Sequence, residues 1–198
     1  MKRSPNDKYS YNIDVVVSGG ARWLPNGFEV QDMKRYKALV DLIHIFKPRS
    51  IIEVGVWNGE NGVRMINAAA QHHGLKNISY IGYDLFEFAN AETDAREFNV
   101  KKVPHHKEVK HSMSTQCPGA DITLVVGDTN VSLKPIRADF VFIDGGHSVQ
   151  TAANDLSKVM RSKIIVLDDY YTMDESGACP DTSKYGVNEV IKDKKHIV

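Results

Sequence analysis

The stretch IIEVGVWNGENG, residues 51–62, decides the fold. It has the pattern of a buried strand that runs into a glycine-bearing turn and then into a helix. Gly55 removes a side chain where a ligand would approach the backbone, and Gly59 and Gly62 permit tight geometry before the helix. A unit of this kind is typical of nucleotide-binding α/β proteins. An ordinary strand-to-helix connection is the alternative.

The spacing of this turn differs from the dinucleotide fingerprint G-x-G-x-x-G. Trp57 and Asn58 occupy the stretch in which that fingerprint needs close approach of the backbone to a pyrophosphate. Glu53, at the end of the strand, would repel a phosphate but would suit a positively charged ligand. The turn therefore favours a cationic ligand over a nicotinamide dinucleotide.

Five short apolar runs are expected to be strands. They are Ile51–Val54, Ile78–Tyr83, Ile122–Val126, Phe140–Ile143 and Ile164–Leu167. They lack alternation, which indicates strands buried on both faces, as in a parallel sheet. Helical patterns lie between them; the first begins near Glu29, and Asn61 and Ser148 are expected to cap two others. Strand–helix alternation predicts an α/β fold with a doubly wound, mostly parallel sheet and helices on both faces.

We expect one domain at residues 29–198, preceded by an N-terminal arm at residues 1–28. Within the arm, residues 13–17 fit either a short strand or a segment lying on the core. Residues 85–121 are too long for one crossover helix, so an insertion is expected there. It contains a helix at residues 89–98 and the basic run KKVPHHKEVKH, which is either a solvated loop or a lid for an anionic acceptor.

The C-terminal end of the sheet is expected to be incomplete. A helix is expected at residues 187–194, and the final HIV has the pattern of one more strand. A full doubly wound sheet usually needs a longer chain than this.

Composition excludes several classes of protein. Lys plus Arg and Asp plus Glu each number 25, so the net charge of zero argues against nucleic-acid binding driven by bulk charge. No apolar run approaches the roughly 20 residues of a membrane helix, and the N-terminus has no secretory signal, so a cytoplasmic protein is expected. Cys117 and Cys179 form neither a disulfide framework nor a zinc pattern.

Two acids follow the second and third predicted strands. Asp84, at the end of ISYIGYD, is placed to accept both ribose hydroxyls of a nucleoside, or else to cap a helix. Gly127-Asp128 follows the next strand, where the acid would face an adenine amino group or cap a turn.

Three more acids follow the fourth and fifth strands. FIDGGHS places Asp144 after one, and IIVLDDYY places Asp168 and Asp169 after the other. If the strand order is 3-2-1-4-5, these two strands are neighbours, about 4.8 Å apart, and the acids converge. Oxygen ligands of this kind select a hard cation such as Mg²⁺. The alternative is that the acids merely end strands or face solvent.

In this order of motifs the sequence resembles the class I S-adenosylmethionine-dependent methyltransferases, which have a Rossmann-like fold. The resemblance covers residues 29–167. It implies that Glu53 and the glycine turn hold the methionine end of the cofactor, that Asp84 holds the ribose, and that the residues around Asp128 hold the adenine. The expected cofactor contacts are Glu53, Gly55, Val56, Trp57, Asn58, Gly59, Asp84, Leu85, Gly127 and Asp128.

The acid pattern is similar to that of the metal-dependent small-molecule O-methyltransferases. The string I-D-G-x-H-S is closer still to the family of macrolide-sugar O-methyltransferases, in which the position of Gly146 is more often acidic. The resemblance implies Mg²⁺ or a similar cation at Asp144, Asp168 and Asp169. His147 is the candidate base for the acceptor hydroxyl; Asp144 or Asp168 could take the proton instead. Alternatively, His147 only begins a helix.

The expected function is methyl transfer from S-adenosylmethionine to a hydroxyl of a small molecule such as a sugar or a glycosylated metabolite. The alternatives are an NAD-type oxidoreductase, a non-catalytic nucleoside-binding module, and a metal-dependent hydroxylase or hydrolase. The remaining histidines, including His72-His73 and His105-His106, have no ligand-like spacing and are expected at the surface. Assembly as a homo-oligomer is left open.

Overall fold

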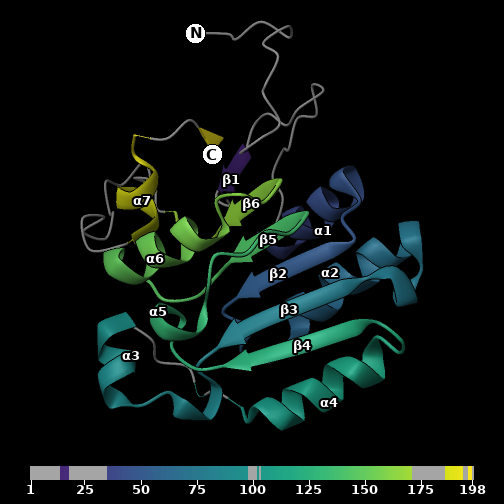
Figure 1. Ribbon diagram of the computed structural model, residues 1–198, viewed down its shortest axis with the longest axis horizontal. Coiled ribbons are helices and arrows are strands. Elements are labelled where there is room, and N and C mark those ends of the chain that lie inside the picture. The colour runs from purple at the N-terminus through teal and green to yellow at the C-terminus, as the bar shows by residue number, and fades with distance from the viewer. Residues whose placement is uncertain are drawn as a thin grey trace, which may run out of the picture.

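The five apolar runs form neighbouring strands of one parallel sheet. The structure is a computed structural model that describes residues 14–17, 35–97, 102, 104–170, 186–193 and 196–197. Within these ranges seven strands pair in the order β4-β3-β2-β5-β6-β1-β7, and every pairing is parallel (Figure 1). The five central strands are β2 (Ser50–Val54), β3 (Ser79–Asp84), β4 (Asp121–Val126), β5 (Phe140–Ile143) and β6 (Ile164–Leu167). The predicted strand order is confirmed.

Two short strands extend the sheet beyond β6. β1 (Asp14–Val17) pairs with β6, and β7 (His196–Ile197) pairs with β1. Of the two alternatives for residues 13–17, the structure has the strand, and the final HIV does contribute a strand. The rest of the expected arm, 1–13 and 18–28, lies outside the described residues, and so does the expected beginning of the first helix near Glu29.

Helices cover both faces of the sheet, as predicted. α1 (Arg35–Phe46), α2 (Glu60–His73) and α4 (His106–Gln116) pack together on one face. α5 (Thr129–Ser132), α6 (Val149–Val159) and α7 (Gly186–Ile191) pack on the other. α3 (Ala91–Glu97) lies beyond the arrowheads of β3 and β4 (Figure 1). Two short 3₁₀ helices, η1 (Leu75–Asn77) and η2 (Phe86–Phe88), complete the described elements.

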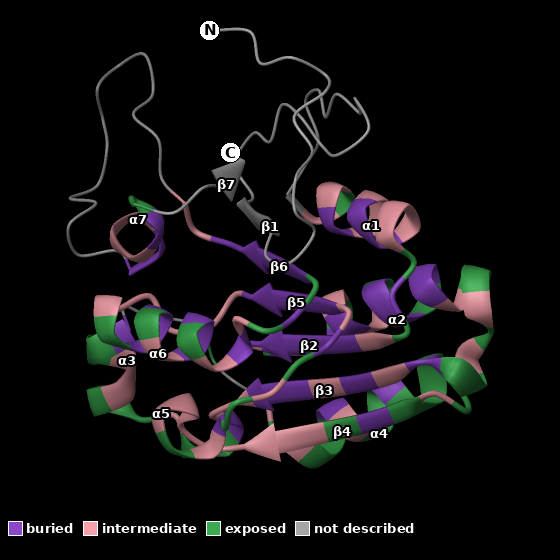
Figure 2. Ribbon diagram, turned by 45° about the horizontal axis from the view of Figure 1, so that its top comes forward, coloured by how far each residue is buried: buried purple, intermediate pink, exposed green. Residues whose placement is uncertain are grey.

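Alternate residues of the strands enter two hydrophobic cores. Ile51 of β2 packs into the core on the side of α1, α2 and α4, whereas Ile52 and Val54 pack into the core on the side of α6 and α7. Every residue of β5 and β6 is buried, and β4 at the edge is only partly covered (Figure 2). The central strands are therefore continuous apolar runs because both of their faces are covered.

The expected cap of α2 was wrong. α2 begins one residue before Asn61, because Gly59 adopts a left-handed conformation (φ 80°) and caps the helix, while the Asn58 side chain accepts a hydrogen bond from the backbone N–H of Glu60. The basic run is not a loop throughout, since α4 begins at His106. Ser148 does cap α6, where its hydroxyl accepts from the backbone N–H of Thr151.

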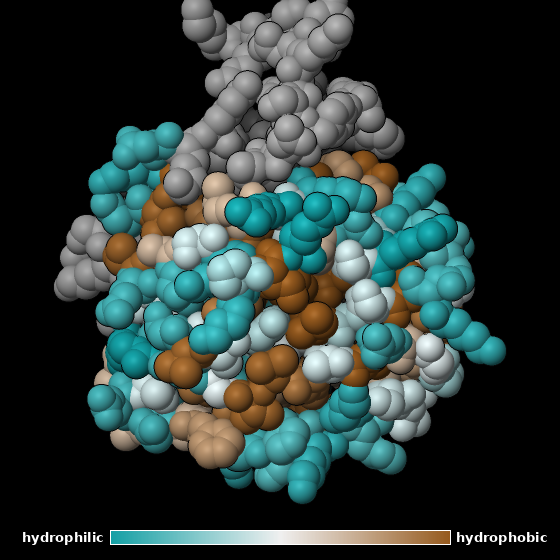
Figure 3. Space-filling view, in the orientation of Figure 1, coloured by the Kyte–Doolittle hydropathy of each residue, from teal (hydrophilic) through white to brown (hydrophobic). Residues whose placement is uncertain are grey.

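The exposed surface mixes hydrophobic and hydrophilic side chains. On the face shown in Figure 3, hydrophobic side chains gather near the middle and hydrophilic ones surround them. None of the helices in the described ranges is long and apolar enough to cross a membrane. Cys117 is a buried free thiol, and Cys179 lies outside the described residues.

Asp155 on α6 provides a stability prediction. Its side chain is fully buried, and burial raises the pKa of the carboxyl to about 6. Between pH 4 and 6 the folded state therefore holds a proton that the unfolded state has lost, so stability falls as pH rises through this interval. Asp155→Asn removes that titration. The difference in free energy of unfolding between variant and native protein should shift in favour of the variant by about 2 kcal/mol from pH 4 to pH 7.5.

Urea unfolding at the two pH values measures this difference. The comparison cancels any constant cost of the buried amide, because that cost is the same at both pH values. If the free energy of unfolding changed with pH in the same way in both proteins, burial would not raise the pKa of Asp155, and the prediction would be wrong.

Candidate active site

A single cleft lies at the carboxyl ends of the central strands. Its volume is about 370 Å³, which is in the range of small-molecule sites. It is lined by residues at or after the ends of β2 to β6 and by residues of five helices: Tyr36, Val54, Gly55, Val56, Trp57, Asn58, Asn61, Tyr83, Asp84, Leu85, Thr93, Asp94, Arg96, Glu97, Gly127, Asp128, Thr129, Asp144, Gly145, Gly146, His147, Thr151 and Asp169. Ligands of open parallel sheets bind at this edge.

The glycine turn forms one wall of the cleft because its backbone is packed tightly against the end of β5. Gly55 has φ 88°, and a Cβ on it would lie 1.9 Å from the backbone oxygen of Asp144. Its N–H donates to the backbone oxygen of Tyr83 at 2.8 Å. No residue other than glycine fits here, and the turn exposes its backbone to the cleft between Val54 and Asn58.

Asp84 joins the end of β3 to the glycine turn. One carboxylate oxygen accepts the backbone N–H of Trp57 at 2.7 Å, and the other accepts the backbone N–H of Phe86 at 2.8 Å. The side chain also lines the cleft. Each carboxylate oxygen has capacity for a second donor, so this position can accept hydroxyl groups of a ligand while it holds the turn.

Asp128 begins α5 and pairs with the insertion. Its side chain accepts the backbone N–H of Asn130 at 2.9 Å and an N–H of Arg96 at 2.8 Å. Burial acts to raise the pKa of Asp128, but the hydrogen bonds from Asn130 and Arg96 outweigh burial and lower it. The carboxylate therefore faces the cleft in its ionised form.

His147 and Asp169 form an ion pair that also lines the cleft. His147 Nε2 lies 2.9 Å from Asp169 Oδ2, and this hydrogen bond raises the pKa of the imidazole against the opposing effect of burial. Asp169 itself has φ 60°, a conformation that is costly outside glycine. Asp144 lines the same part of the cleft.

Asp168 lies beside this ion pair. It is nearly fully buried, and its Oδ1 accepts the backbone N–H of Asp169 at 2.9 Å. It lines a small adjoining cavity together with Asp144, His147 and Asp169. Among the described residues, the set of three acid or histidine side chains with ligand atoms all within 4.8 Å of one another is elsewhere, at Glu87, His105 and His106.

Two expected cofactor contacts do not line the cleft. Glu53 is fully buried on the side of α2, where the Tyr80 hydroxyl donates to its Oε2 and Oε1 has no hydrogen-bond partner. Burial raises the pKa of Glu53 well above its usual value, and the charges of Asp144 and Asp84 add to this effect. Gly59 instead packs against α4, where a Cβ added to Gly59 would lie 2.8 Å from Met113 Cγ.

The sequence did not reveal the part that α3 plays in the cleft. Glu97 is buried, and it accepts the backbone N–H of Ser148 at 2.9 Å and the Thr151 hydroxyl at 2.7 Å. A Cβ on Gly146 would lie 2.6 Å from Glu97 Oε2. The carboxylate of Glu97 therefore occupies the space that a side chain at position 146 would need, which is the position expected to be acidic in the related enzymes.

Glu97→Gln tests this contact. Burial acts to raise the pKa of Glu97, but hydrogen bonds from Ser148, Thr151 and Arg96 lower it, so the native group is a carboxylate. An amide places an N–H₂ against one of these donors, and we expect a loss of about 1–3 kcal/mol in free energy of unfolding. Urea denaturation measures it. Glu92→Gln, an exposed change on the same helix, should cost less than about 0.5 kcal/mol; equal costs would mean that the buried contacts add nothing.

Comparison with known proteins agrees with this architecture. A family model described as "Methyltransferase domain" matches residues 52–170, more than half of the chain. The O-methyltransferase NovP is similar in structure, with a TM-score of 0.58 and 18% identity over 86% of this chain and 76% of NovP. The O-methyltransferase TomG from Streptomyces achromogenes, solved in complex with S-adenosylmethionine, has a TM-score of 0.51 and 16% identity over 81% of this chain and 66% of TomG.

At these identities the two structures establish the fold, and the family model establishes the family. A search of curated proteins by sequence finds no match. The expectation of a Rossmann-like methyltransferase is confirmed by both comparisons. The chain is a member of the methyltransferase-domain family.

Proposed function

We propose that this protein is an O-methyltransferase that moves a methyl group from S-adenosylmethionine to a hydroxyl of a small molecule with the help of a divalent cation. The observation that carries the proposal is one cleft that is lined both by the glycine turn and Asp84 and by Asp144, His147 and Asp169. Nucleoside and acceptor can therefore meet in one space.

The charge of the cleft supports a cationic cofactor. Among the described lining residues the acids are Asp84, Asp94, Glu97, Asp128, Asp144 and Asp169, and the one arginine is Arg96. A negatively charged cleft attracts the sulfonium and ammonium groups of S-adenosylmethionine and repels the pyrophosphate of a dinucleotide. Asp84 would hold the ribose, the backbone between Gly55 and Asn58 the methionine end, and Gly127-Asp128 the adenine.

The proposed cation site uses oxygen ligands only. Asp144, Asp168 and Asp169 lie around one small cavity at the ends of adjacent strands, and carboxylates suit a hard cation such as Mg²⁺. The three carboxylates must draw together from their present positions to share one ion. When bound, a cation lowers the pKa of an acceptor hydroxyl and orients it.

The chain's own residues supply the remaining chemistry. The acceptor oxygen attacks the methyl carbon, the carbon–sulfur bond breaks, and S-adenosylhomocysteine leaves with the electron pair. His147 Nε2–H donates to Asp169. The other ring nitrogen, Nδ1, takes the hydroxyl proton, and Asp169 stabilises the imidazolium that forms. Alignment of the oxygen within about 3–3.5 Å of the methyl carbon provides much of the remaining rate.

The acceptor is proposed to be a sugar or a glycosylated metabolite. Its support is the motif string around Asp144 and His147. Incubation of the protein with isotopically labelled S-adenosylmethionine, Mg²⁺ and a library of hydroxylated compounds should give a labelled methyl ether. Cofactor affinity with no product from any acceptor would favour a binding module, and turnover that needs metal but no sulfonium compound would favour a hydroxylase or hydrolase.

Asp168→Asn tests the metal role. Loss of one carboxylate charge should lower metal-dependent turnover by about 100-fold, because the cation contributes several kcal/mol to the transition state. Calorimetric affinity for S-adenosylhomocysteine should be nearly unchanged, since Asp168 does not line the main cleft. The control is Asp121→Asn at the exposed beginning of β4. A collapse of cofactor affinity in Asp168→Asn would contradict this placement.

A further inference from the structure

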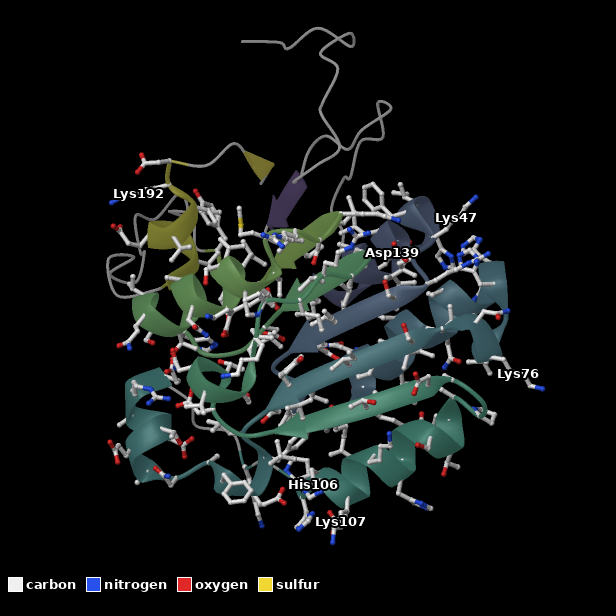
Figure 4. All side chains as sticks on the ribbon, in the orientation of Figure 1. Lys47, Lys76, His106, Lys107, Asp139 and Lys192 are labelled. Carbon is white, nitrogen blue, oxygen red and sulfur yellow. The ribbon has the colours of Figure 1, made fainter. Side chains whose placement is uncertain are left out.

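A second group of metal-ligating side chains lies outside the cleft, where η2 meets the beginning of α4. Glu87 Oε1 is 2.5 Å from His106 Nδ1 and 3.4 Å from His105 Nε2. Figure 4 shows His106 at the beginning of α4. No ligand-like spacing in the sequence points to these histidines, since Glu87 is 19 residues from His106. We propose that Glu87, His105 and His106 bind one divalent cation of the Zn²⁺ class.

The geometry is close to that of a tetrahedral ion. With bonds of about 2.0–2.1 Å, tetrahedral ligand atoms lie about 3.3 Å apart. The Glu87–His105 separation of 3.4 Å already matches this value, and the Glu87–His106 separation has to open by about 0.8 Å when the shared proton is replaced by an ion. All three ligand atoms lie within 4.8 Å of one another.

The ligand types select the ion. Two imidazoles with one carboxylate suit Zn²⁺, Co²⁺ or Ni²⁺ and do not suit Mg²⁺, which prefers oxygen ligands. This site is therefore chemically distinct from the aspartates of the cleft. Glu87 and His106 are each 28% exposed and His105 is 46% exposed, so an ion can reach the site and water can complete its shell.

The backbone holds the ligands in place. The N–H of His106 donates to Glu87 Oε2 at 3.1 Å, and the two imidazole rings stack with centroids 4.8 Å apart. Phe86, immediately before Glu87, is fully buried with φ 47°. An aromatic residue adopts this conformation only where its surroundings impose it, so the direction of Glu87 is fixed by the fold.

Binding requires one local change. His105 Nδ1 now accepts the backbone N–H of Lys107 at 3.2 Å and caps α4. Coordination through Nε2 puts the ring proton on Nδ1, so this cap is lost and must be replaced by water. The cost of a lost cap, about 1 kcal/mol, is small beside the free energy of a zinc site.

The site joins the two ends of the segment that carries α3. Glu87 precedes α3, and His105 and His106 follow it in the chain. Residues of α3, including Arg96 and Glu97, line the cleft. An ion at this site would therefore link the residues that precede and follow α3, and so help to hold α3 beside the cleft. The contact between Glu97 and Ser148 holds α3 there as well.

Titration of the full chain with Co²⁺ alone, without cofactor or acceptor, tests the proposal. We expect one equivalent to bind with the visible absorption of tetrahedral cobalt, to be displaced by Zn²⁺ and not by Mg²⁺, and to raise the melting temperature. Glu87→Gln and His106→Ala should each lower the affinity for Co²⁺ by at least about 10-fold and remove the rise in melting temperature. Because no cofactor is present, the outcome is independent of the methyl-transfer proposal.

Two controls locate the ion. His44 Nδ1 of α1 and His72 Nε2 of α2 lie 3.0 Å apart. His72→Ala therefore removes a competing pair of imidazoles. Asp168→Asn removes a proposed ligand of the cleft, where oxygen ligands hold a cation in an octahedral shell and give no tetrahedral cobalt band. Both variants should keep the tetrahedral cobalt absorption. Its absence from the native protein, its survival in Glu87→Gln and His106→Ala with native circular dichroism, or its loss in either control would each overturn the proposal.

Discussion

Gly55→Ala should destabilise the protein by about 2–5 kcal/mol and abolish binding of S-adenosylhomocysteine. The added Cβ would lie 1.9 Å from the backbone oxygen of Asp144 and 2.7 Å from the Cα of Gly145. These are backbone atoms of the neighbouring strand end, so relief requires β2 and β5 to separate at the cleft. The left-handed φ of 88° adds about 1 kcal/mol for any residue with a side chain.

Gly74→Ala is the matched control for this change. Gly74 also has a positive φ, 77°, but its Cβ would meet no atom within 4 Å. This variant should lose about 1–3 kcal/mol for its strained backbone and keep its affinity for the cofactor. Urea unfolding and calorimetry separate the two effects. If both variants lost the same stability and both bound the cofactor, the tight contact between the glycine turn and β5 would have no importance for the site.

His147→Ala should lower turnover by about 10²–10⁴-fold while affinity for S-adenosylhomocysteine stays nearly unchanged. A positioned base contributes a factor of this size, and the imidazole is held by Asp169 at 2.9 Å in the wall of the cleft. Steady-state kinetics under saturating cofactor measures the change. The loss should lie in kcat, because the proton moves only in the chemical step.

The control for this variant is His111→Ala, an exposed histidine on α4 that does not line the cleft. It should have native kinetics. Turnover of His147→Ala within a few-fold of the native value would transfer the role of base to Asp144 or Asp168.

Much of the cleft could be predicted from the sequence because parallel strands bring their carboxyl ends to one edge. Asp84, Asp128 and Asp144 follow three different strands, and the strand order alone makes them neighbours. Strand order also predicts that Asp168 lies beside Asp144, but it does not predict how deeply Asp168 is buried. The turn after β6 buries Asp168 and directs Asp169 to the cleft.

Glu53 shows where this reasoning stops. A strand buried on both faces has no polar alternation, so the sequence does not say which core each side chain enters. Ile51 enters the core on the side of α2, and Glu53, two residues later, lies on that same side against Tyr80. The acid is therefore behind the turn and not in the cleft.

The insertion could be predicted to exist, but its path could not. No periodicity relates Glu97 of α3 to Gly146, or Glu87 to His106, because these contacts depend on how the segment returns across the ends of the strands. Such contacts come from tertiary packing and leave no local pattern in the chain.

Calorimetry with the native protein tests the central claim most directly. We predict that S-adenosylhomocysteine binds with a stoichiometry of one, and that NADH at the same concentration gives no heat of binding. Saturable binding of NADH without any affinity for S-adenosylhomocysteine would contradict the account.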